Sequence, residues 1–265
     1  MSQFVVSARK YRPSRFEDVI GQNHIAKTLQ NALVTNQLAH AFLFCGPRGV
    51  GKTTCARILA KVINCETPVN NVEPCNSCSS CKSFSENASF NIFELDAASN
   101  NSVEHIRTLI EQVRYQPQQG SHKVFIIDEV HMLSTQAFNA FLKTLEEPPS
   151  YAIFILATTE KHKIIPTILS RCQIFDFKRI QPNDIVVQLQ KICKDEGRIA
   201  DQEALHQIAL KADGGMRDAL SIFDKIAGAT EGTITYKDVI QNLNVLDYDY
   251  YFKICDAFQK SDLPS

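Results

Sequence analysis

The sequence predicts an α/β fold, a parallel sheet with helices on both faces, followed by a smaller all-helical domain. Five short apolar runs, bounded by polar residues or glycine, are typical of buried strands: 41–44, 92–95, 124–127, 152–156 and 174–177. Stretches with helical spacing of apolar residues lie between them, as at Val103, Ile106 and Ile110. Strands that alternate with helices imply crossover connections and a parallel sheet.

After Gln181-Pro182 the strand-like runs stop, and helical spacing continues alone, first at Ile185, Leu189 and Ile192. We therefore expect a sheet domain over 1–180 and a helical domain over 181–243. The Gly214-Gly215 pair separates two of the expected helices, because paired glycines punctuate regular structure.

Composition excludes several classes of protein. The 28 Lys and Arg residues nearly balance 29 Asp and Glu, and 44% of residues are hydrophobic, which argues against disorder, collagen and coiled coils. Near-neutral charge gives no chain-wide signature of nucleic-acid binding, so any DNA contact has to come from a local patch or from several copies acting together. No apolar run approaches the roughly 18 residues of a membrane span, and we expect a cytoplasmic protein.

A phosphate-binding loop is predicted directly after the first strand, at the start of a helix. Its glycines let backbone N–H groups converge on phosphate oxygens, and the helix N-terminus adds a favourable dipole. Lys52 would neutralise the β- and γ-phosphates, and Thr53 would ligate Mg²⁺. The alternative is a glycine-rich turn with a chance Lys-Thr pair. The expected phosphate-site residues are Gly46, Pro47, Arg48, Gly49, Val50, Gly51, Lys52, Thr53 and Thr54.

Two carboxylates, Asp128 and Glu129, follow the apolar run 124–127. Ligands bind beyond the carboxyl ends of strands in open α/β sheets, so this pair is expected beside the phosphate loop. Asp128 would hold the Mg²⁺, directly or through water, and Glu129 would act as general base on an attacking water. The pair favours nucleotide hydrolysis over nucleotide storage, the alternative being a solvated acidic pair that caps a strand.

Four of the nine cysteines have the spacing of metal ligands: Cys65, Cys75, Cys78 and Cys81. Four thiolates on a polar loop suit a tetrahedral structural zinc with no open position for catalysis. An iron–sulfur cluster uses the same ligands and remains a rival, as do free thiols. The other cysteines are expected to be small core residues: Cys45, Cys55, Cys172, Cys193 and Cys255.

These motifs resemble the gamma/tau clamp-loader ATPases of bacterial DNA polymerase III, which are AAA+ proteins. Besides the phosphate loop and the four cysteines, the matching segments are 11–13, 19–22, 128–133, 143–149, 157–159 and 170–172. The resemblance covers roughly residues 5–243. It implies an AAA+ P-loop NTPase domain with a five-stranded parallel sheet and an inserted four-cysteine zinc module over 65–81, followed by a small all-α helical lid domain.

The resemblance also implies roles for residues outside the two nucleotide motifs. Four residues would line the adenine pocket: Tyr11, Arg12, Val19 and Ile20. Thr159, after the fourth strand, would sense the γ-phosphate, with Thr158 as the alternative. Arg171 would be an arginine finger that reaches a neighbouring subunit's ATP, because a cation there stabilises charge in the transition state. Arg217 would contact the γ-phosphate of its own subunit's ATP.

The implied activity is Mg²⁺-dependent ATP hydrolysis that opens a sliding clamp and loads it on primed DNA. The implied partners are the other subunits of a hetero-pentameric loader, the clamp, primer–template DNA, and the polymerase core and helicase through further C-terminal domains. DNA phosphate contacts are expected near 100–104 and 166–167. Residues 244–265 would begin a truncated oligomerising collar, so we expect no stable pentamer from these residues alone. As a holoenzyme subunit the protein would be classed with DNA-directed DNA polymerases, although it would not polymerise.

Two other interpretations compete with the clamp loader. One is a non-hydrolysing AAA+ adaptor whose nucleotide site is only structural. Four residues argue against it: Lys52, Asp128, Glu129 and Arg171. The other is a different AAA+ DNA motor, such as a helicase or a Holliday-junction motor, in which the cysteine loop between Cys65 and Cys81 is not expected.

Overall fold

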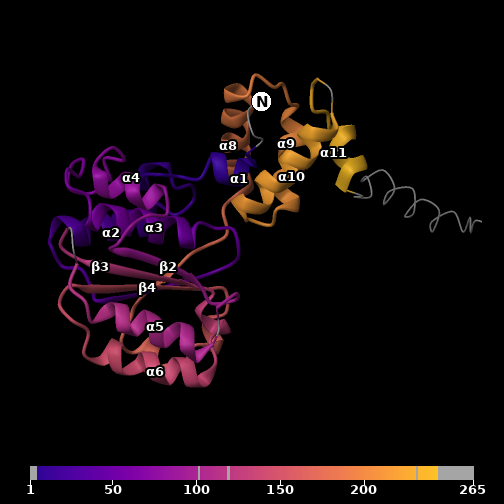
Figure 1. The fold of residues 1–265 in the computed structure, drawn as a ribbon. Helices are drawn as coiled ribbons and strands as arrows, with labels where there is room; N and C mark the ends of the chain where they lie inside the picture. The colour runs from indigo at the N-terminus through magenta and orange to yellow at the C-terminus, as the bar shows by residue number, and fades with distance from the viewer. Residues whose placement is uncertain (1–4, 101, 118–119, 231, 244–265) are drawn as a thin grey trace, which may run out of the picture. The chain divides into compact units, whose positions relative to one another are not determined.

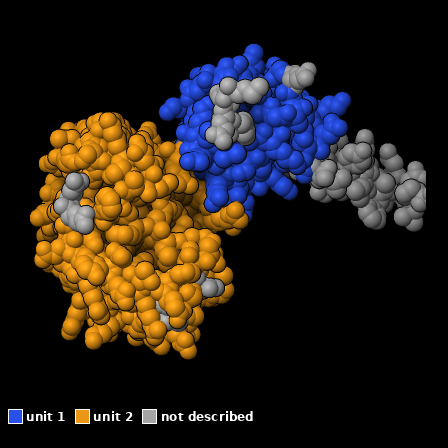
Figure 2. Space-filling model, in the orientation of Figure 1, with its two compact units in different colours: residues 1–11, 181–265 blue, residues 12–180 orange. Residues whose placement is uncertain are grey.

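The computed structural model describes residues 5–100, 102–117, 120–230 and 232–243. The chain divides into two compact units, which Figure 2 colours separately. We call residues 12–180 the sheet unit, and residues 5–11 together with the described part of 181–243 the helical unit.

The sheet unit contains five parallel strands in the order β2-β3-β4-β1-β5. Their bounds are β1 Ala41–Cys45, β2 Ile92–Asp96, β3 Lys123–Asp128, β4 Ala152–Thr158 and β5 Gln173–Asp176. All five expected strands are confirmed. The three central strands β1, β3 and β4 are almost wholly buried, which explains why they form continuous apolar runs rather than alternating ones.

Helices cover both faces of this sheet, as Figure 1 shows. One face carries α2 (Asn23–Val34), α3 (Lys52–Ile63) and α4 (Ser79–Ser85); the other carries α5 (Val103–Val113) and α6 (Thr135–Glu146). Successive side chains of a strand point to opposite faces. Thus Phe42 and Phe44 belong to the core beneath α2 and α3, whereas Leu43 belongs to the core beneath α5 and α6.

Short elements complete the sheet unit: the 3₁₀ helices η1 (Phe16–Asp18), η2 (Val130–Met132) and η3 (Lys161–Lys163), and α7 (Pro166–Leu169). The parallel register pairs Cys45 with Thr158, and Ile127 with Leu156. The carboxyl ends of β1, β3 and β4 therefore meet at one edge of the sheet, where parallel α/β folds place their ligands.

The helical unit consists of α1 (Ser7–Lys10), α8 (Pro182–Asp195), α9 (Gln202–Lys211), α10 (Met216–Ala229) and α11 (Tyr236–Leu243). The helix α8 starts with Pro182 at its first position, where the missing N–H costs no hydrogen bond. The helices pack around side chains that include Leu189, Leu205 and Phe223, all buried. No helix in the described ranges has the length and apolar character that crossing a membrane requires.

The N-terminal boundary of the expected 1–180 domain differs from the structure, because residues 5–11 belong to the helical unit. The backbone N–H of Ser7 donates to Asp224 Oδ2 at 2.7 Å, and the Ser7 hydroxyl donates to the same carboxylate. Lys10 forms an ion pair of 3.0 Å with Glu196. These partners lie far along the chain, so local pattern gives no sign of them. The expected collar over 244–265 lies outside the described residues.

Phe141 tests the core beneath α6. Its buried ring meets that of Phe154 edge-on, with centroids 5.1 Å apart. Phe141→Ala is expected to lower the free energy of unfolding by about 3–5 kcal/mol, because it leaves a cavity between α6 and the sheet. Phe90 is 74% exposed, so Phe90→Ala should change that free energy by no more than about 0.5 kcal/mol. Urea denaturation measures both variants, and equal losses would contradict this core.

Candidate nucleotide site and cysteine cluster

The phosphate loop joins β1 to α3 through three glycines in the positive-φ region: 147° at Gly46, 76° at Gly49 and 105° at Gly51. A Cβ on Gly46 would lie 2.5 Å from the backbone oxygen of Phe177, so the close approach of β5's end requires glycine there. The helix α3 begins at Lys52. Its first backbone N–H groups have no partner within the helix and provide donors for an anion.

Lys52 is buried among polar groups of this loop, with 5% exposure. Its Nζ donates to the carbonyl oxygens of Gly46 at 2.8 Å and Pro47 at 2.7 Å. Burial lowers the pKa of Lys52, and the nearby carboxylates of Glu129 and Asp128 act in the opposite direction. A buried ammonium held only by neutral carbonyls gains from an anionic oxygen, which makes Lys52 a suitable phosphate ligand.

The two residues expected at the magnesium site are in direct contact. The Thr53 hydroxyl donates to Asp128 Oδ2 at 2.6 Å. Glu129, the next residue, has a φ of 49°, and its N–H donates to Asp128 Oδ1 at 3.0 Å. Positive φ is uncommon outside glycine, and such backbone strain is concentrated at functional sites. The hydroxyl and carboxylate are the hard oxygen ligands that Mg²⁺ prefers.

The structure distinguishes the two candidate sensor threonines. Thr159, directly after β4, donates to Glu129 Oε2 from its N–H at 3.3 Å and from its hydroxyl at 3.0 Å. Thr158 is fully buried, and its hydroxyl pairs with His131 Nδ1 at 3.0 Å and accepts from the Glu160 N–H at 3.0 Å. Of the two hydroxyls, that of Thr159 is the one in contact with the expected general base.

His131 is part of this cluster, although the sequence alone assigns it no chemistry. Its side chain is 6% exposed, with Nδ1 3.5 Å from Glu129 Oε2 and Nε2 3.2 Å from Glu160 Oε1. A single histidine forms no recognisable pattern. Its place becomes visible only when the register of β3 and β4 brings the turn after each strand together.

Val19, expected at the adenine, packs against the phosphate loop. It is 5% exposed, and its Cγ1 lies 3.9 Å from where a Cβ on Gly51 would be. Gln22, which belongs to the matching segment 19–22 but was assigned no role from the sequence, holds this segment with two hydrogen bonds to Lys178. Its Nε2 donates to the Lys178 carbonyl at 2.6 Å, and its Oε1 accepts from the Lys178 N–H at 3.2 Å. Ile20 lies in the turn between them.

The remaining expected residues are found on other elements. Tyr11 belongs to the helical unit, where its hydroxyl donates to Glu196 at 3.2 Å. Arg12 begins the sheet unit, and Arg217 is exposed at the second position of α10 in the helical unit. Arg171 follows α7, and its guanidinium donates to the Thr167 carbonyl at 2.7 Å and to Glu146 Oε1 at 2.8 Å. Arg171 thus contacts α6 and α7 rather than the phosphate loop.

The four expected metal ligands come together, with their sulfur atoms all within 4.8 Å of one another. The Sγ atoms of Cys65 and Cys78 are 4.0 Å apart. A tetrahedral zinc with bonds of about 2.3 Å places its sulfurs about 3.8 Å apart, so this donor set fits the metal. Backbone N–H groups of Cys75, Cys78 and Cys81 donate to cluster sulfurs at 3.3–3.5 Å.

Environment shifts the pKa values of the cysteines in both directions, and within the cluster burial raises those of Cys65 and Cys81. Hydrogen bonds from the Thr67 and Ser77 side chains lower the pKa of Cys75 to about 5. Burial instead raises the pKa of Cys45 to about 11 and of Cys55 to about 12, as expected for thiols in a core. Cys193 is also buried, Cys172 is half-buried, and Cys255 lies outside the described residues.

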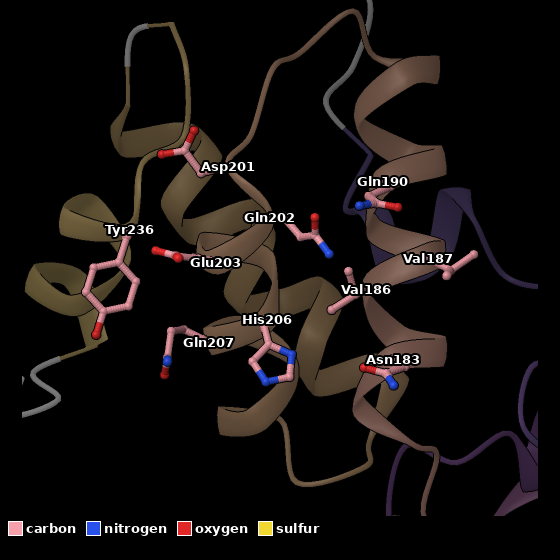
Figure 3. A pocket seen from close by; sticks show the side chains of 10 residues that line it. All are labelled: Asn183, Val186, Val187, Gln190, Asp201, Gln202, Glu203, His206, Gln207 and Tyr236. Atoms are coloured by element: carbon pink, nitrogen blue, oxygen red, sulfur yellow. The ribbon is translucent and has the colours of Figure 1, made fainter. Parts of the chain in front are cut away.

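A groove of about 1110 Å³ lies in the helical unit, between α8, α9 and the start of α11 (Figure 3). Its lining is mostly polar, with Gln190, His206 and Tyr236 among the side chains that surround it. None of the expected nucleotide or metal residues lines this groove.

Comparisons with known proteins agree with this arrangement. The family described as "DNA polymerase III, delta subunit" matches residues 21–181, and "DNA polymerase III clamp loader subunit, ATPase lid domain" matches residues 184–230. DNA polymerase III subunit tau of Bacillus subtilis is 49% identical over 96% of this chain, which spans 45% of that relative's length. The gamma subunit of Buchnera aphidicola is 42% identical over 97% of this chain and 70% of its own.

Among solved structures, the RuvB Holliday junction branch migration motor of Thermotoga maritima is similar in fold. The TM-score is 0.65 with 20% sequence identity, over 89% of this chain and 73% of RuvB. At this identity the likeness concerns the AAA+ fold alone.

The lid match begins three residues after the first family match ends, and the relatives at 42–49% identity span both units. The resemblance that the motifs indicate is therefore confirmed, and this chain belongs to the gamma/tau family of DNA polymerase III clamp-loader subunits, which have an AAA+ ATPase fold.

Proposed function

We propose that this chain is the ATP-driven motor subunit of a sliding-clamp loader. It binds and hydrolyses ATP with Mg²⁺, and it uses that cycle to open a clamp and load it on primed DNA during replication. The observation that carries the proposal is the contact between Thr53 and Asp128 at 2.6 Å, beside buried Lys52 and the strained Glu129. The proposal concerns ATP hydrolysis and not nucleotide polymerisation.

In this proposal the phosphate loop and Lys52 bind the triphosphate. Nζ of Lys52 exchanges its two loop carbonyls for β- and γ-phosphate oxygens, which are stronger acceptors because they are charged. Thr53 and Asp128 would hold Mg²⁺, which neutralises developing charge on the phosphates. Val19 and Ile20 contact the adenine, and Tyr11 and Arg12 complete its pocket.

Glu129 orients the water that attacks the γ-phosphate. In the structure its Oε2 accepts from both the N–H and the hydroxyl of Thr159. A bound γ-phosphate offers the Thr159 hydroxyl a second acceptor. When the hydroxyl turns to the phosphate, Glu129 Oε2 loses one of its two hydrogen bonds from Thr159 and can accept from the water, so the hydrogen bonding of the general base depends on the nucleotide state.

Arg171 acts as the arginine finger on a neighbouring subunit's ATP, and Arg217 contacts the γ-phosphate of its own. The ion pair of Arg171 with Glu146 is partly exposed, with side-chain exposures of 33% and 48%. Such pairs contribute about 1 kcal/mol or less. Assembly can therefore redirect the guanidinium at little cost, which fits a residue that acts only within a complex.

The partners follow from the same function. They are the other loader subunits, the sliding clamp and primer–template DNA, with the polymerase core and helicase bound through regions beyond these residues. We place this work in the cytoplasm. The cysteine cluster binds one structural zinc, because four thiols at these distances match a tetrahedral four-cysteine site and leave no position for substrate.

The first experiment is steady-state ATP hydrolysis in a loader assembled with a chain that extends beyond residue 265, with and without clamp and primed DNA. Arg171→Ala should lower stimulated turnover by about 10³-fold while this chain still binds ATP, because the finger serves the next subunit's transition state. Glu146→Gln is the matched control: it breaks the same ion pair but retains the guanidinium, and should hydrolyse ATP normally. If clamp and DNA do not change the rate of ATP hydrolysis by the assembled wild type, the adaptor interpretation is favoured.

Glu129→Gln tests the general base. Hydrolysis should fall by about 10²–10⁴-fold because an amide cannot take the proton, whereas ATP binding should persist because the phosphate loop is intact. Single-turnover hydrolysis and equilibrium binding separate the two effects. Glu111→Gln, an exposed change of the same chemistry on α5, should leave both unchanged. Normal hydrolysis by Glu129→Gln would remove Glu129 from the mechanism.

Zinc content tests the cysteine cluster. Elemental analysis of the purified protein should give about one zinc per chain, and Cys78→Ser should lower both the zinc content and the melting temperature, since metal ligation is coupled to folding. Cys172→Ser, outside the cluster, should retain the metal. Iron with visible absorption would instead indicate an iron–sulfur cluster.

A further inference from the structure

Glu73 is a buried carboxylate that neither the phosphate loop nor the cysteine cluster uses directly. It is 6% exposed. Its Oε2 accepts from the N–H of Phe16 at 2.8 Å, and its Oε1 accepts from the N–H of Glu17 at 3.3 Å and from Nε2 of Gln30 at 2.9 Å. A carboxylate is costly to bury unless donors satisfy it, so these three bonds fix both the side chain and the backbone that it holds.

The cysteine cluster determines where Glu73 lies. Glu73 and Val69 exchange two backbone hydrogen bonds, of 2.8 and 3.0 Å, which close a tight loop. Cys75 follows two residues later, and its N–H donates to Cys65 Sγ at 3.4 Å. The loop that carries Glu73 is thus anchored by cluster cysteines at both ends, and assembling the cluster places the carboxylate.

A second series of contacts connects Glu73 to the nucleotide site. The carbonyl of Phe16 accepts from the N–H of Val19 at 3.1 Å, and both side chains are buried in one core cluster. Val19 in turn shares that core cluster with Val50 of the phosphate loop, and a Cβ built on Gly51 would lie 3.9 Å from Cγ1 of Val19. The segment 16–20 therefore lies between Glu73 and Gly51, and a contiguous series of contacts joins the cysteine cluster to the site.

We propose that Glu73 is a positioning residue for the part of the nucleotide site that contacts adenine. By holding the backbone at residues 16–17, its carboxylate sets the position of Val19 and Ile20, and it makes that position depend on the cysteine cluster. This inference rests on the proposed function, in which these two residues contact the adenine. The cluster then contributes to nucleotide affinity although it touches no nucleotide.

The test compares two ligands that both carry a triphosphate, of which only ATP also carries adenosine. Glu73→Gln keeps the shape of the side chain but replaces one acceptor oxygen with an NH₂ donor that opposes a backbone N–H. We expect the affinity for Mg²⁺–ATP to fall roughly tenfold, as for loss of a hydrogen bond to a charged group. The affinity for Mg²⁺–tripolyphosphate should stay within about twofold, because it uses the phosphate loop alone. Isothermal titration calorimetry on the 265-residue chain measures both.

Two further variants separate positioning from general damage. Glu86→Gln removes a carboxylate from the exposed end of α4, beside the same cluster, and should leave both affinities unchanged. Gln30→Met retains the Glu73 carboxylate and removes one donor to it, so it should show a smaller loss of the same selectivity. Circular dichroism establishes whether each variant folds. If Glu73→Gln does not fold, the same two affinities are measured on Gln30→Met instead.

Each outcome decides the question. An ATP-selective loss supports the positioning role. An unchanged ratio of the two affinities overturns it. If neither affinity changes, the adenine side of the site is unaffected, and if both fall equally, the whole site is damaged. A wild-type chain that binds neither ligand contradicts the proposed ATPase itself, and the inference falls with it.

Discussion

The hydrogen bond from Thr53 to Asp128 joins two parts of the sheet that are not neighbours. Thr53 lies in the first turn of α3, after β1, whereas Asp128 ends β3, and β4 lies between these two strands. The contact exists only because the parallel register brings three strand ends to one edge of the sheet. A shift in that register would separate the hydroxyl from the carboxylate and divide the site in two. The buried, apolar strands are thus the condition for the polar chemistry at their ends.

Buried charge in the sheet unit is held mainly by backbone groups. Lys52 donates to two loop carbonyls, and Glu73 accepts from two backbone N–H groups and one side-chain amide. Neither arrangement requires a buried ion pair, whose desolvation would be costly. The two arrangements differ in whether a ligand can replace the partners of the charged group. Lys52 holds weak, neutral acceptors that a phosphate can replace, whereas Glu73 is satisfied by donors that keep a segment in place.

Sequence pattern predicts those parts of the site whose signals are local. The strands, the phosphate loop and Asp128 each depend on residues close together in the chain, and the structure brings them to the expected edge of the sheet. The roles of His131, Gln22 and Glu73 could not be assigned in this way, because each makes a hydrogen bond to a partner 27 to 156 positions away. Ser7 is the extreme case: its partner lies 217 positions along the chain. Local periodicity therefore could not assign the N-terminal helix to the helical unit.

The chain passes between its two units twice, at residues 11–12 and 180–181. On the sheet side these two passages are tied together, since Gln22 binds the backbone of Lys178, and Gly21 lies against Ile180. Both passages therefore leave the sheet unit from one place, and neither can shift there without the other. Cutting the chain at either passage would still leave the two units joined covalently through the other.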